Sequence, residues 1–247
     1  MNQSVIQLHR PGQLQLSALP PLSLYIHLPW CLKKCPYCDF NSHEAKGEFP
    51  EQRYLDALRA DLESSLPLIW GRSVHSVFIG GGTPSLFSPD AIDRLLSDVR
   101  ALLRLEADTE ITLEANPTSV EAENFRSYRA AGVNRVSVGV QSLNEAHLKA
   151  LGRQHTPEEA LAAFRLAAKI FPRVSFDMIY ARPDQSLADW RDELSRALGE
   201  QQGHMSLYQL TIEPETRFAD LHAAGKLLVP GDDLAADLYD LTQEMTE

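Results

Sequence analysis

The sequence has no long apolar segment, no excess of positive charge and few cysteines, three in 247 residues. No stretch approaches the roughly 20 consecutive apolar residues that cross a bilayer, so no transmembrane segment is predicted. The formal net charge is −11, with 23 basic against 34 acidic residues, and this balance argues against nucleic acid as a main partner. Residues 1–21 lack the apolar core of a secretory signal peptide, and we predict a loosely ordered leader there.

The three cysteines lie close together, as Cys31, Cys35 and Cys38 in the pattern C-x-x-x-C-x-x-C. Structural zinc sites use four ligands and disulfide frameworks use even numbers, so three thiols fit neither pattern. Three thiolates can hold a [4Fe–4S] cluster and leave one iron open to a small molecule. The alternatives are a zinc loop completed by His27 or His43, and three inert thiols. Clustered, unpaired thiols are typical of the reducing cytosol, so we predict a cytoplasmic protein.

Short β-branched or aromatic runs alternate with amphipathic helical patterns along the chain. The predicted strands are residues 22–28, 76–80, 110–115, 135–140, 174–180 and 205–212. They are mostly apolar rather than alternating, which is typical of parallel strands covered on both faces. Proline follows a capping residue at Ser88 and at Thr156, so a helix is predicted to begin after each. The sequence therefore predicts an α/β fold with a parallel sheet, and both a doubly wound sheet and a barrel fit this pattern.

The length fits one core domain, which we place at residues 22–230. Within it a helix is predicted over 121–131, ended by Gly132 as a C-cap. Residues 231–247 have apolar side chains at helical spacing but end without a cap or a helix breaker. We expect them to begin a C-terminal region of a longer protein that is truncated here, with a simple C-terminal helix as the alternative.

Three consecutive glycines follow the second predicted strand, in Gly80-Gly81-Gly82-Thr83-Pro84. Because these glycines have no side chains, the turn between strand and helix lets a ligand contact backbone N–H and C=O groups. The segment is neither a G-x-G-x-x-G dinucleotide motif nor a P-loop, since no Gly-Lys-Ser/Thr follows. Glycine-rich turns occur in many nucleotide-binding folds, so this one is specific only in combination with the cysteine loop.

Polar residues stand at or near the ends of three otherwise apolar strands: Glu114, Gln141 and Asp177. A buried polar group without a partner costs about 1–3 kcal/mol, so each needs a partner in the fold or in a ligand. Pairing with a neighbouring strand or capping a helix is the alternative for each. Functional residues gather at the C-terminal ends of parallel strands, so a pocket shared with the cysteine loop is predicted. Arg153 offers a fork for a carboxylate, although its spacing alone favours a surface ion pair.

Six segments of the sequence match a known family: YIHLPWCLKKCPYCDF, GGGTPSL, EANP, GVQS, LGRQH and LYQLTIEP. Together they resemble the radical SAM (S-adenosylmethionine) superfamily, and within it the HemW group of haem chaperones. This resemblance implies an open (β/α)6 partial TIM barrel with a [4Fe–4S] cluster on the three cysteines. It also implies that SAM is surrounded by Tyr25, Gly81, Gly82, Thr83, Glu114, Gln141, Arg153 and Asp177. In this superfamily a reduced cluster passes an electron to SAM, and the protein orients the reacting groups.

The residue at position 40, here Phe40, distinguishes two groups of proteins that this chain resembles. Oxygen-independent coproporphyrinogen III oxidases, which act in porphyrin biosynthesis, have a further cysteine at the matching position. Phe40 therefore favours a haem chaperone, with the oxidase as the alternative. The resemblance implies haem as cargo, apo-haemoproteins as recipients and an electron donor such as flavodoxin or ferredoxin. The chain departs from the family in having Ala181-Arg182-Pro183 instead of Gly-Leu-Pro, and it lacks the haem-linked His-Asn-x-x-Tyr-Trp element.

Overall fold

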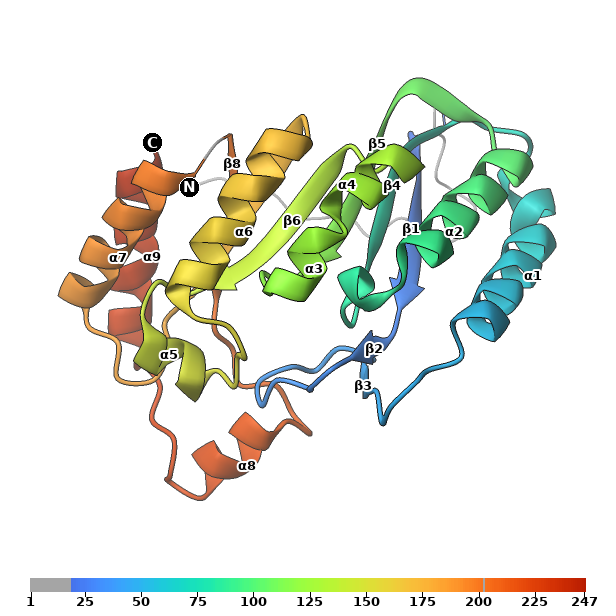
Figure 1. The fold of residues 1–247 in the computed structure, drawn as a ribbon. Helices are drawn as coiled ribbons and strands as arrows, with labels where there is room; N and C mark the ends of the chain where they lie inside the picture. The colour runs from blue at the N-terminus through green and yellow to red at the C-terminus, as the bar shows by residue number, and fades with distance from the viewer. Residues whose placement is uncertain (1–18, 202) are drawn as a thin grey trace, which may run out of the picture.

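The computed structural model describes residues 19–201 and 203–247, so the leader predicted for 1–21 lies almost wholly outside the described residues. Its central feature is a parallel sheet of six strands (Figure 1). The strands are β1 (Leu22–Leu28), β4 (Val74–Gly81), β5 (Leu105–Ala115), β6 (Arg135–Gln141), β7 (Arg173–Tyr180) and β8 (His204–Gln209). All six predicted strands are confirmed, although β5 begins earlier than predicted and β8 ends at residue 209 rather than 212.

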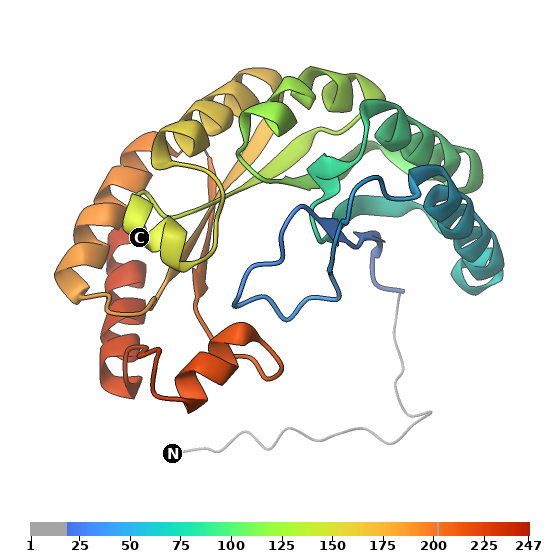
Figure 2. The same ribbon diagram turned by 60° about the horizontal axis from the view of Figure 1, so that its bottom comes forward.

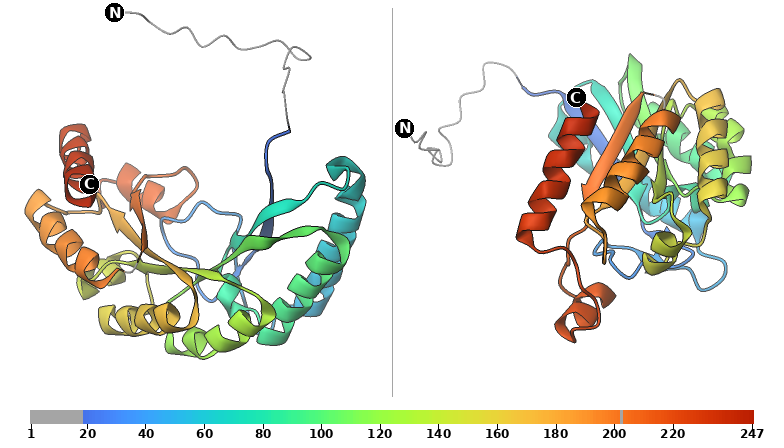
Figure 3. Two further views of the ribbon diagram at one scale, coloured as in Figure 1. Left: turned by 90° about the horizontal axis from the view of Figure 1, so that it is seen from above. Right: turned by 90° about the vertical axis from the view of Figure 1, so that its left-hand side faces the viewer.

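The strands lie side by side in the order in which they occur in the chain, β1-β4-β5-β6-β7-β8, and every neighbouring pair is parallel. A doubly wound sheet reverses its strand order at a switch point, and this order contains no reversal. The sheet curves, with the helices on its convex side (Figure 2 and Figure 3). Within the described residues the edge strands β1 and β8 do not pair with each other. The predicted open (β/α)6 partial barrel is therefore confirmed.

The helices are α1 (Glu51–Ile69), α2 (Pro89–Leu102), α3 (Ser119–Glu123), α4 (Phe125–Ala131), α5 (Glu145–Ala150), α6 (Pro157–Ile170), α7 (Leu187–Glu200), α8 (Arg217–Ala223) and α9 (Asp232–Thr246). The last two follow β8, and α8 lies at the mouth of the barrel rather than on the convex side (Figure 2). The connecting loops contain two short strands, β2 (Trp30–Cys31) and β3 (His43–Glu44), and a 3₁₀ turn (Pro84–Leu86). Among the described residues, no helix combines the length and apolar character that crossing a membrane requires.

The predicted helix starts are confirmed by side-chain caps. The Ser88 hydroxyl accepts a hydrogen bond from the backbone N–H of Ala91 (3.2 Å) at the start of α2. Thr156 and Glu159 form a reciprocal capping box at the start of α6, with bonds of 3.2 and 2.8 Å. Each cap satisfies backbone donors that the first turn of a helix leaves unpaired. These starts depend on contacts over three residues, which is why the sequence alone predicts them.

The helix predicted over 121–131 is instead two helices, α3 and α4. At their junction the backbone N–H of Asn124 bonds to the carbonyl of Glu121, three residues back (3.1 Å), and this tighter turn ends α3. The Glu121 side chain points inward and accepts a hydrogen bond from the backbone N–H of Asn116 (3.0 Å). The predicted end of α4 is confirmed, because Gly132 caps it at φ 113°.

The main hydrophobic core lies between the sheet and the helices, and α9 belongs to it. Trp190 of α7 is fully buried, and its indole N–H donates to Thr242 Oγ1 of α9 (2.8 Å). Leu238 and Leu241 of α9 are buried in the same apolar cluster as the sheet residues. The helix α9, which the sequence predicts to begin a separate C-terminal region, therefore packs with the same core as residues 22–230.

The cysteine loop leaves the C-terminal end of β1 and lies across the mouth of the partial barrel (Figure 2). Parallel pairing of β2 with β3 closes the loop on itself. On one side α8 packs against it, with the backbone N–H of Phe218 donating to the Pro36 carbonyl (2.9 Å). On another side Gly152 approaches so closely that a Cβ atom there would lie 2.6 Å from Pro36 Cδ. These contacts hold the loop over the ends of the strands.

Candidate functional site

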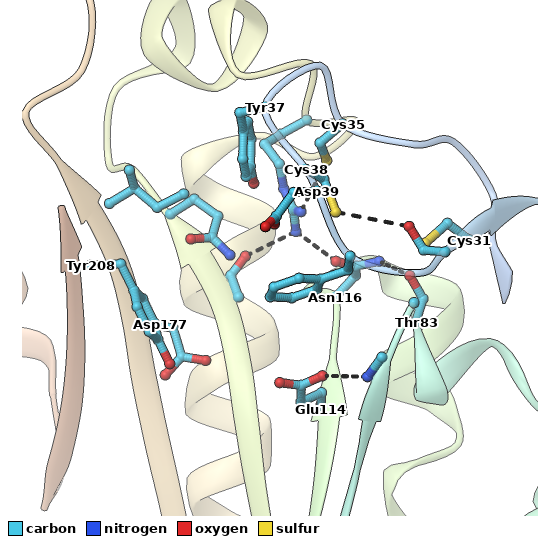
Figure 4. A pocket seen from close by; sticks show the side chains of 18 of the residues that line it. Cys31, Cys35, Tyr37, Cys38, Asp39, Thr83, Glu114, Asn116, Asp177 and Tyr208 are labelled. Atoms are coloured by element: carbon cyan, nitrogen blue, oxygen red, sulfur yellow. Dashed lines mark hydrogen bonds between the residues drawn. The ribbon is translucent and has the colours of Figure 1, made fainter. Parts of the chain in front are cut away.

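A cavity of about 460 Å³ lies beneath the cysteine loop, at the C-terminal ends of the strands (Figure 4). The predicted site residues that line it are Cys31, Cys35, Cys38, Gly81, Gly82, Thr83, Glu114, Gln141, Arg153 and Asp177. Tyr25 is not among the lining residues: it lies on β1, 57% exposed, with its hydroxyl 3.0 Å from His27 Nδ1. The structure thus gathers the motifs in one pocket, and the placement of Tyr25 beside SAM stays a prediction.

The three thiols are free and differ in burial. Cys31 is buried, whereas Cys35 and Cys38 are partly exposed at the cavity wall. Burial raises the pKa of the Cys31 thiol, and the nearby hydroxyls of Thr83 and Ser42 oppose that rise. Ser42 Oγ also lies 3.8 Å from Cys38 Sγ. The loop therefore presents sulfur atoms with hydroxyl groups beside them.

The alternative zinc site gains no support from the histidine on β1. Both ring nitrogens of His27 have partners: Nδ1 contacts a tyrosine hydroxyl (3.0 Å) and Nε2 contacts the Asn41 carbonyl (2.8 Å). Over the part of the chain that the structure describes, no three His, Cys, Asp or Glu side chains are grouped to hold one metal ion. The loop is instead held together by Lys34, whose ammonium donates to the carbonyls of Phe40 (2.9 Å) and Ser42 (3.3 Å).

The glycine turn is explained by its contact with the cysteine loop. A Cβ atom on Gly82 would lie 2.7 Å from the carbonyl carbon of Pro29 and from the carbonyl oxygen of Trp30. The backbone N–H of Gly82 donates to the Leu28 carbonyl (2.8 Å). The next N–H, of Thr83, donates to the Trp30 carbonyl (2.8 Å). The two turns are joined backbone to backbone, so glycine is required there independently of any ligand, and the ligand contact stays a prediction.

Arg153 does not form the surface ion pair that its spacing favours. Its guanidinium is partly buried and donates to Asn116 Oδ1 (2.5 Å) and to the Gly139 carbonyl (3.2 Å). Its Nη1 lies 3.6 Å from Cys35 Sγ. The sequence could not show this contact, because it joins residues 118 positions apart.

Burial raises the pKa of two of the carboxyl groups that line the cavity, those of Glu114 and Asp177. Burial raises the pKa of Glu114 to about 7, while a hydrogen bond from the backbone N–H of Gly81 (3.2 Å) opposes the rise. The pKa of Asp177 is raised by burial against the effect of hydroxyl donors on neighbouring strand positions. Two of these donors are Ser137 (2.6 Å) and Ser175 (2.8 Å). Asp177 is thus both paired within the sheet and a lining residue of the cavity.

Gln141 is aimed by an irregularity in β6. The pairing of β6 with β7 shifts register between Gly139 and Gln141, and Gln141 has φ 66°. Its Oε1 is buried without a hydrogen-bond partner among the described residues. A Cβ atom on Gly139 would lie 2.8 Å from Gln141 Nε2 and 3.4 Å from Arg153 Nη2. Bulges often lie beside active sites, where they change the direction of a side chain. The contact of Gln141 with SAM stays a prediction.

The cavity residues that the sequence prediction omits include Tyr37, Asn116 and Tyr208. Asn116 carries a signal, since it directly follows β5 in the EANP segment, at the edge where functional residues gather. Tyr37 stands between two of the cysteines, so it could have been included with them. Tyr208 is an aromatic residue on an apolar strand, and nothing in the sequence separates it from a core residue.

The loop after β7 has Ala181-Arg182-Pro183 where the family has Gly-Leu-Pro, and its first residue adopts a backbone conformation that glycine favours. Ala181 has φ 56°, in the left-handed region that costs other residues about 1–2 kcal/mol. Arg182 is 1% exposed and forms a salt bridge with Glu193 of α7. The same carboxylate accepts hydrogen bonds from the Ser142 hydroxyl and the Leu143 N–H, each at 2.6 Å. The buried pair thus ties the loop after β7 to the loop after β6.

The sequence matches the family model of the radical SAM superfamily over residues 25–197. The chain belongs to the radical SAM superfamily. It is 50% identical over 223 residues to the haem chaperone HemW of Escherichia coli, covering 90% of this chain and 58% of that protein. It is 49% identical over 228 residues to the HemW of Haemophilus influenzae, with shares of 90% and 58%.

A solved structure shows the same architecture as this radical SAM chain. Coproporphyrinogen III oxidase (HemN) from Escherichia coli matches it with a TM-score of 0.80 and 30% identity, over 91% of this chain and 52% of that chain. All predicted site residues lie inside the range that matches the family model. The chain spans about 58% of the length of the haem chaperones it matches.

Proposed function

We propose that this radical SAM chain carries the cluster and SAM site of a haem chaperone, which delivers haem to apo-haemoproteins. The observation that carries the proposal is the meeting of three free thiols, the Arg153 guanidinium and the carboxyl groups of Glu114 and Asp177 in one cavity. The identity of 50% to a protein named a haem chaperone supports it. Haem, its recipients and an electron donor such as flavodoxin or ferredoxin are parts of the proposal. So is a cytoplasmic location, which clustered free thiols favour.

The three thiols fit a [4Fe–4S] cluster. Cys31, Cys35 and Cys38 would each hold one iron as thiolates, which is the ligand that such clusters use. The guanidinium of Arg153 lies 3.6 Å from Cys35 Sγ, one of these three sulfurs. When bound, the cluster supplies an electron and one open iron position for a chelating ligand. The chain's own residues hold the cluster at the mouth of the barrel.

The cavity fits SAM in volume and in chemistry. Its volume of about 460 Å³ lies in the range of roughly 300–1,000 Å³ that small-molecule sites have. Arg153 suits a carboxylate, and the glycine turn at Gly81 and Gly82 offers backbone groups to an ammonium. Asp177 suits the hydroxyls of a ribose, and Gln141 Oε1 has room for one more donor. These residues would bind and orient SAM beneath the cluster.

Phe40 favours the chaperone over the oxidase. It lines the cavity and is 58% exposed, at the position where the oxidases have a further cysteine. A phenyl ring offers neither a thiol nor a titratable group for porphyrinogen chemistry. The oxidase structure is also less similar in sequence, at 30% identity against 50% for the chaperone.

Anaerobic reconstitution tests the cluster. We expect about four irons and four sulfides per chain, because a cubane cluster contains these numbers. Replacing Cys31, Cys35 or Cys38 by alanine should abolish the broad brown absorption. One tightly held zinc and no iron would contradict the proposal. Addition of SAM should then change the electron paramagnetic resonance (EPR) spectrum of the reduced cluster, and an unchanged spectrum would contradict the SAM site.

A comparison of two activities tests the function. With SAM and dithionite present we expect no conversion of coproporphyrinogen III to protoporphyrinogen IX, with HemN as the positive control. A longer protein that contains this chain should bind haem and pass it to an apo-haemoprotein, as followed by absorbance. These 247 residues alone should bind haem weakly or not at all, because they do not contain the His-Asn-x-x-Tyr-Trp element that the resemblance links to haem. Measurable decarboxylation of coproporphyrinogen III would overturn the chaperone and favour the oxidase.

A further inference from the structure

The strand β6 ends in a tight backbone turn centred on Gln141. The backbone N–H of Ser142 donates to the Val140 carbonyl (2.8 Å), and this hydrogen bond closes a turn of three residues. Gln141, in the middle of the turn, has φ 66°. Turns of three residues with a positive φ at the centre are the rare and strained form. The strained residue is also a lining residue of the cavity.

The two residues that follow this turn are held by one side chain, the carboxylate of Glu193 on α7. Glu193 Oε1 accepts a hydrogen bond from the Ser142 hydroxyl and one from the Leu143 N–H, each at 2.6 Å. Ser142 is 0% exposed and Glu193 is 6% exposed, so solvent does not replace these bonds. A strained backbone conformation persists only where surrounding contacts hold it. The bonds from α7 are therefore suited to hold the turn at Gln141.

Arg182 keeps this carboxylate in place. Its guanidinium is buried and donates from Nη1 to Glu193 Oε1 (3.2 Å) and from Nη2 to Glu193 Oε2. Burial acts to raise the pKa of Glu193, but hydrogen bonds and the charge of Arg182 outweigh burial and hold that pKa below its usual value. Glu193 is therefore a carboxylate that only accepts hydrogen bonds. The family resemblance gives leucine in place of Arg182, so this ion pair is not implied by the resemblance.

Arg153, at the other end of the loop after β6, is held by contacts of its own. Its guanidinium donates to Asn116 Oδ1 (2.5 Å) and to the Gly139 carbonyl (3.2 Å). Its backbone N–H donates to the Leu148 carbonyl (2.9 Å) at the end of α5. The hydrogen bonds to the carboxylate of α7 therefore act on the beginning of the loop, where Gln141 lies.

We propose that Glu193 is a positioning residue of the cofactor pocket, which holds the turn at Gln141 so that the Gln141 amide reaches its ligand. The inference rests on the proposed SAM site, in which Gln141 contacts SAM. The required feature of Glu193 is an acceptor that faces Ser142 and Leu143. Its negative charge is required only because a buried guanidinium without a partner is costly. Arg182 thus positions Glu193, and Glu193 positions the turn.

Two double variants of the full chain separate the acceptor from the charge. Arg182→Leu with Glu193→Gln removes both charges and keeps an oxygen that can accept from Ser142 and Leu143. Arg182→Leu with Glu193→Leu removes both charges and the acceptor. SAM affinity is measured by equilibrium dialysis on anaerobically reconstituted protein. We expect the variant without the acceptor to bind SAM about tenfold more weakly than the variant with it, as the loss of one hydrogen bond implies.

A third substitution identifies the residue through which the effect passes. Gln141→Ala is introduced into the parent and into both double variants. In the parent it should weaken SAM binding about tenfold, because one hydrogen bond to the ligand is lost. Once the Gln141 amide is absent, the two double variants should bind SAM equally, because the acceptor then has no amide to position. A purely structural role of Glu193 would leave their difference in place.

A control on the same helix and a milder variant protect the result against misfolding. Glu200 of α7 pairs with Arg165 of α6 through two hydrogen bonds of 3.0 and 2.5 Å, and neither residue lines the cavity. Glu200→Gln should bind SAM like the parent. Ser142→Ala removes one of the two bonds to Glu193 and keeps the ion pair, so it should weaken SAM binding in the same direction. Circular dichroism and iron content are measured for every variant.

The outcomes distinguish this inference from the proposed function. Equal SAM affinity of the two double variants would overturn this inference and leave the proposed SAM site standing. So would a difference that persists after Gln141→Ala, because Glu193 would then act by another route, such as Arg153. A parent chain that binds no SAM would overturn the proposed site and this inference with it.

Discussion

Replacing Gly82 by alanine tests whether the glycine turn is required by the cysteine loop or only by a ligand. Gly82 is not among the glycines with positive φ, so alanine does not strain its backbone. The added Cβ would lie 2.7 Å from backbone atoms of Pro29 and Trp30, whereas ordinary contacts begin at 3.4 Å. No change of rotamer relieves an overlap with backbone. The start of the cysteine loop must therefore move.

The size of the effect follows from two opposing terms. Overpacking of this kind costs about 1–3 kcal/mol. Alanine also restricts the unfolded chain, which offsets roughly 0.4–1 kcal/mol of that cost. The free energy of unfolding should fall by about 1–2 kcal/mol, which corresponds to roughly 2–8 °C in Tm for a chain of this size.

Gly199 provides the matched control. It lies in α7, and a Cβ atom there would meet no atom within 4 Å. Alanine in a helix is more stable than glycine by about 0.5–1 kcal/mol, so Gly199→Ala should raise Tm.

Thermal unfolding is followed by circular dichroism on the chain without SAM, and iron content is measured after reconstitution. We expect Gly82→Ala to lower both Tm and iron content and Gly199→Ala to leave iron content unchanged. Because SAM is absent, a lost ligand contact cannot explain the result. If the Tm and the iron content of Gly82→Ala equal those of the parent, the reasoning is refuted.

Three further changes test the cavity. The folded pKa of Glu114, about 7, lies above its ordinary value of 4.5, so the folded chain binds an extra proton and stability falls as pH rises between these values. Urea unfolding should show that Glu114→Gln removes this decrease, on the order of 1–3 kcal/mol; identical pH profiles would contradict it. Gly139→Ala displaces only the end of the Gln141 side chain, so Tm should change little while SAM binding in equilibrium dialysis weakens about tenfold. If Gly139→Ala binds SAM as tightly as the parent, this prediction is wrong. Asp177→Ala should weaken SAM binding by on the order of 1 kcal/mol, and no change would place the ribose elsewhere.

Local sequence determined most of the secondary structure and the chemistry of the cysteine loop. Apolar, β-branched runs predict all six strands, and the caps at Ser88 and Thr156 predict two helix starts. These features depend on hydrogen bonds and side-chain contacts over a few residues, so the neighbouring residues in the sequence are enough to predict them. The cysteine spacing likewise predicts a ligand set, because all three sulfurs come from one loop.

The site could be predicted in outline but not in detail. Glu114, Gln141 and Asp177 meet because the ends of parallel strands share one edge, which the sequence implies. The surface ion pair that spacing alone favours for Arg153 is wrong, and Asn116 is missed. Their mutual bond joins residues 37 positions apart, and nothing local indicates it.

Only the tertiary structure decided the open barrel and the reason for the glycines. A doubly wound sheet and a barrel have the same alternation of strands and helices, and they differ in which strands become neighbours. The order β1-β4-β5-β6-β7-β8 settles that choice. Gly82 is likewise explained by the backbone of Pro29 and Trp30, more than 50 positions earlier in the chain. Periodicity and composition describe what each segment can form alone, whereas neighbouring strands and backbone contacts depend on how distant segments pack together.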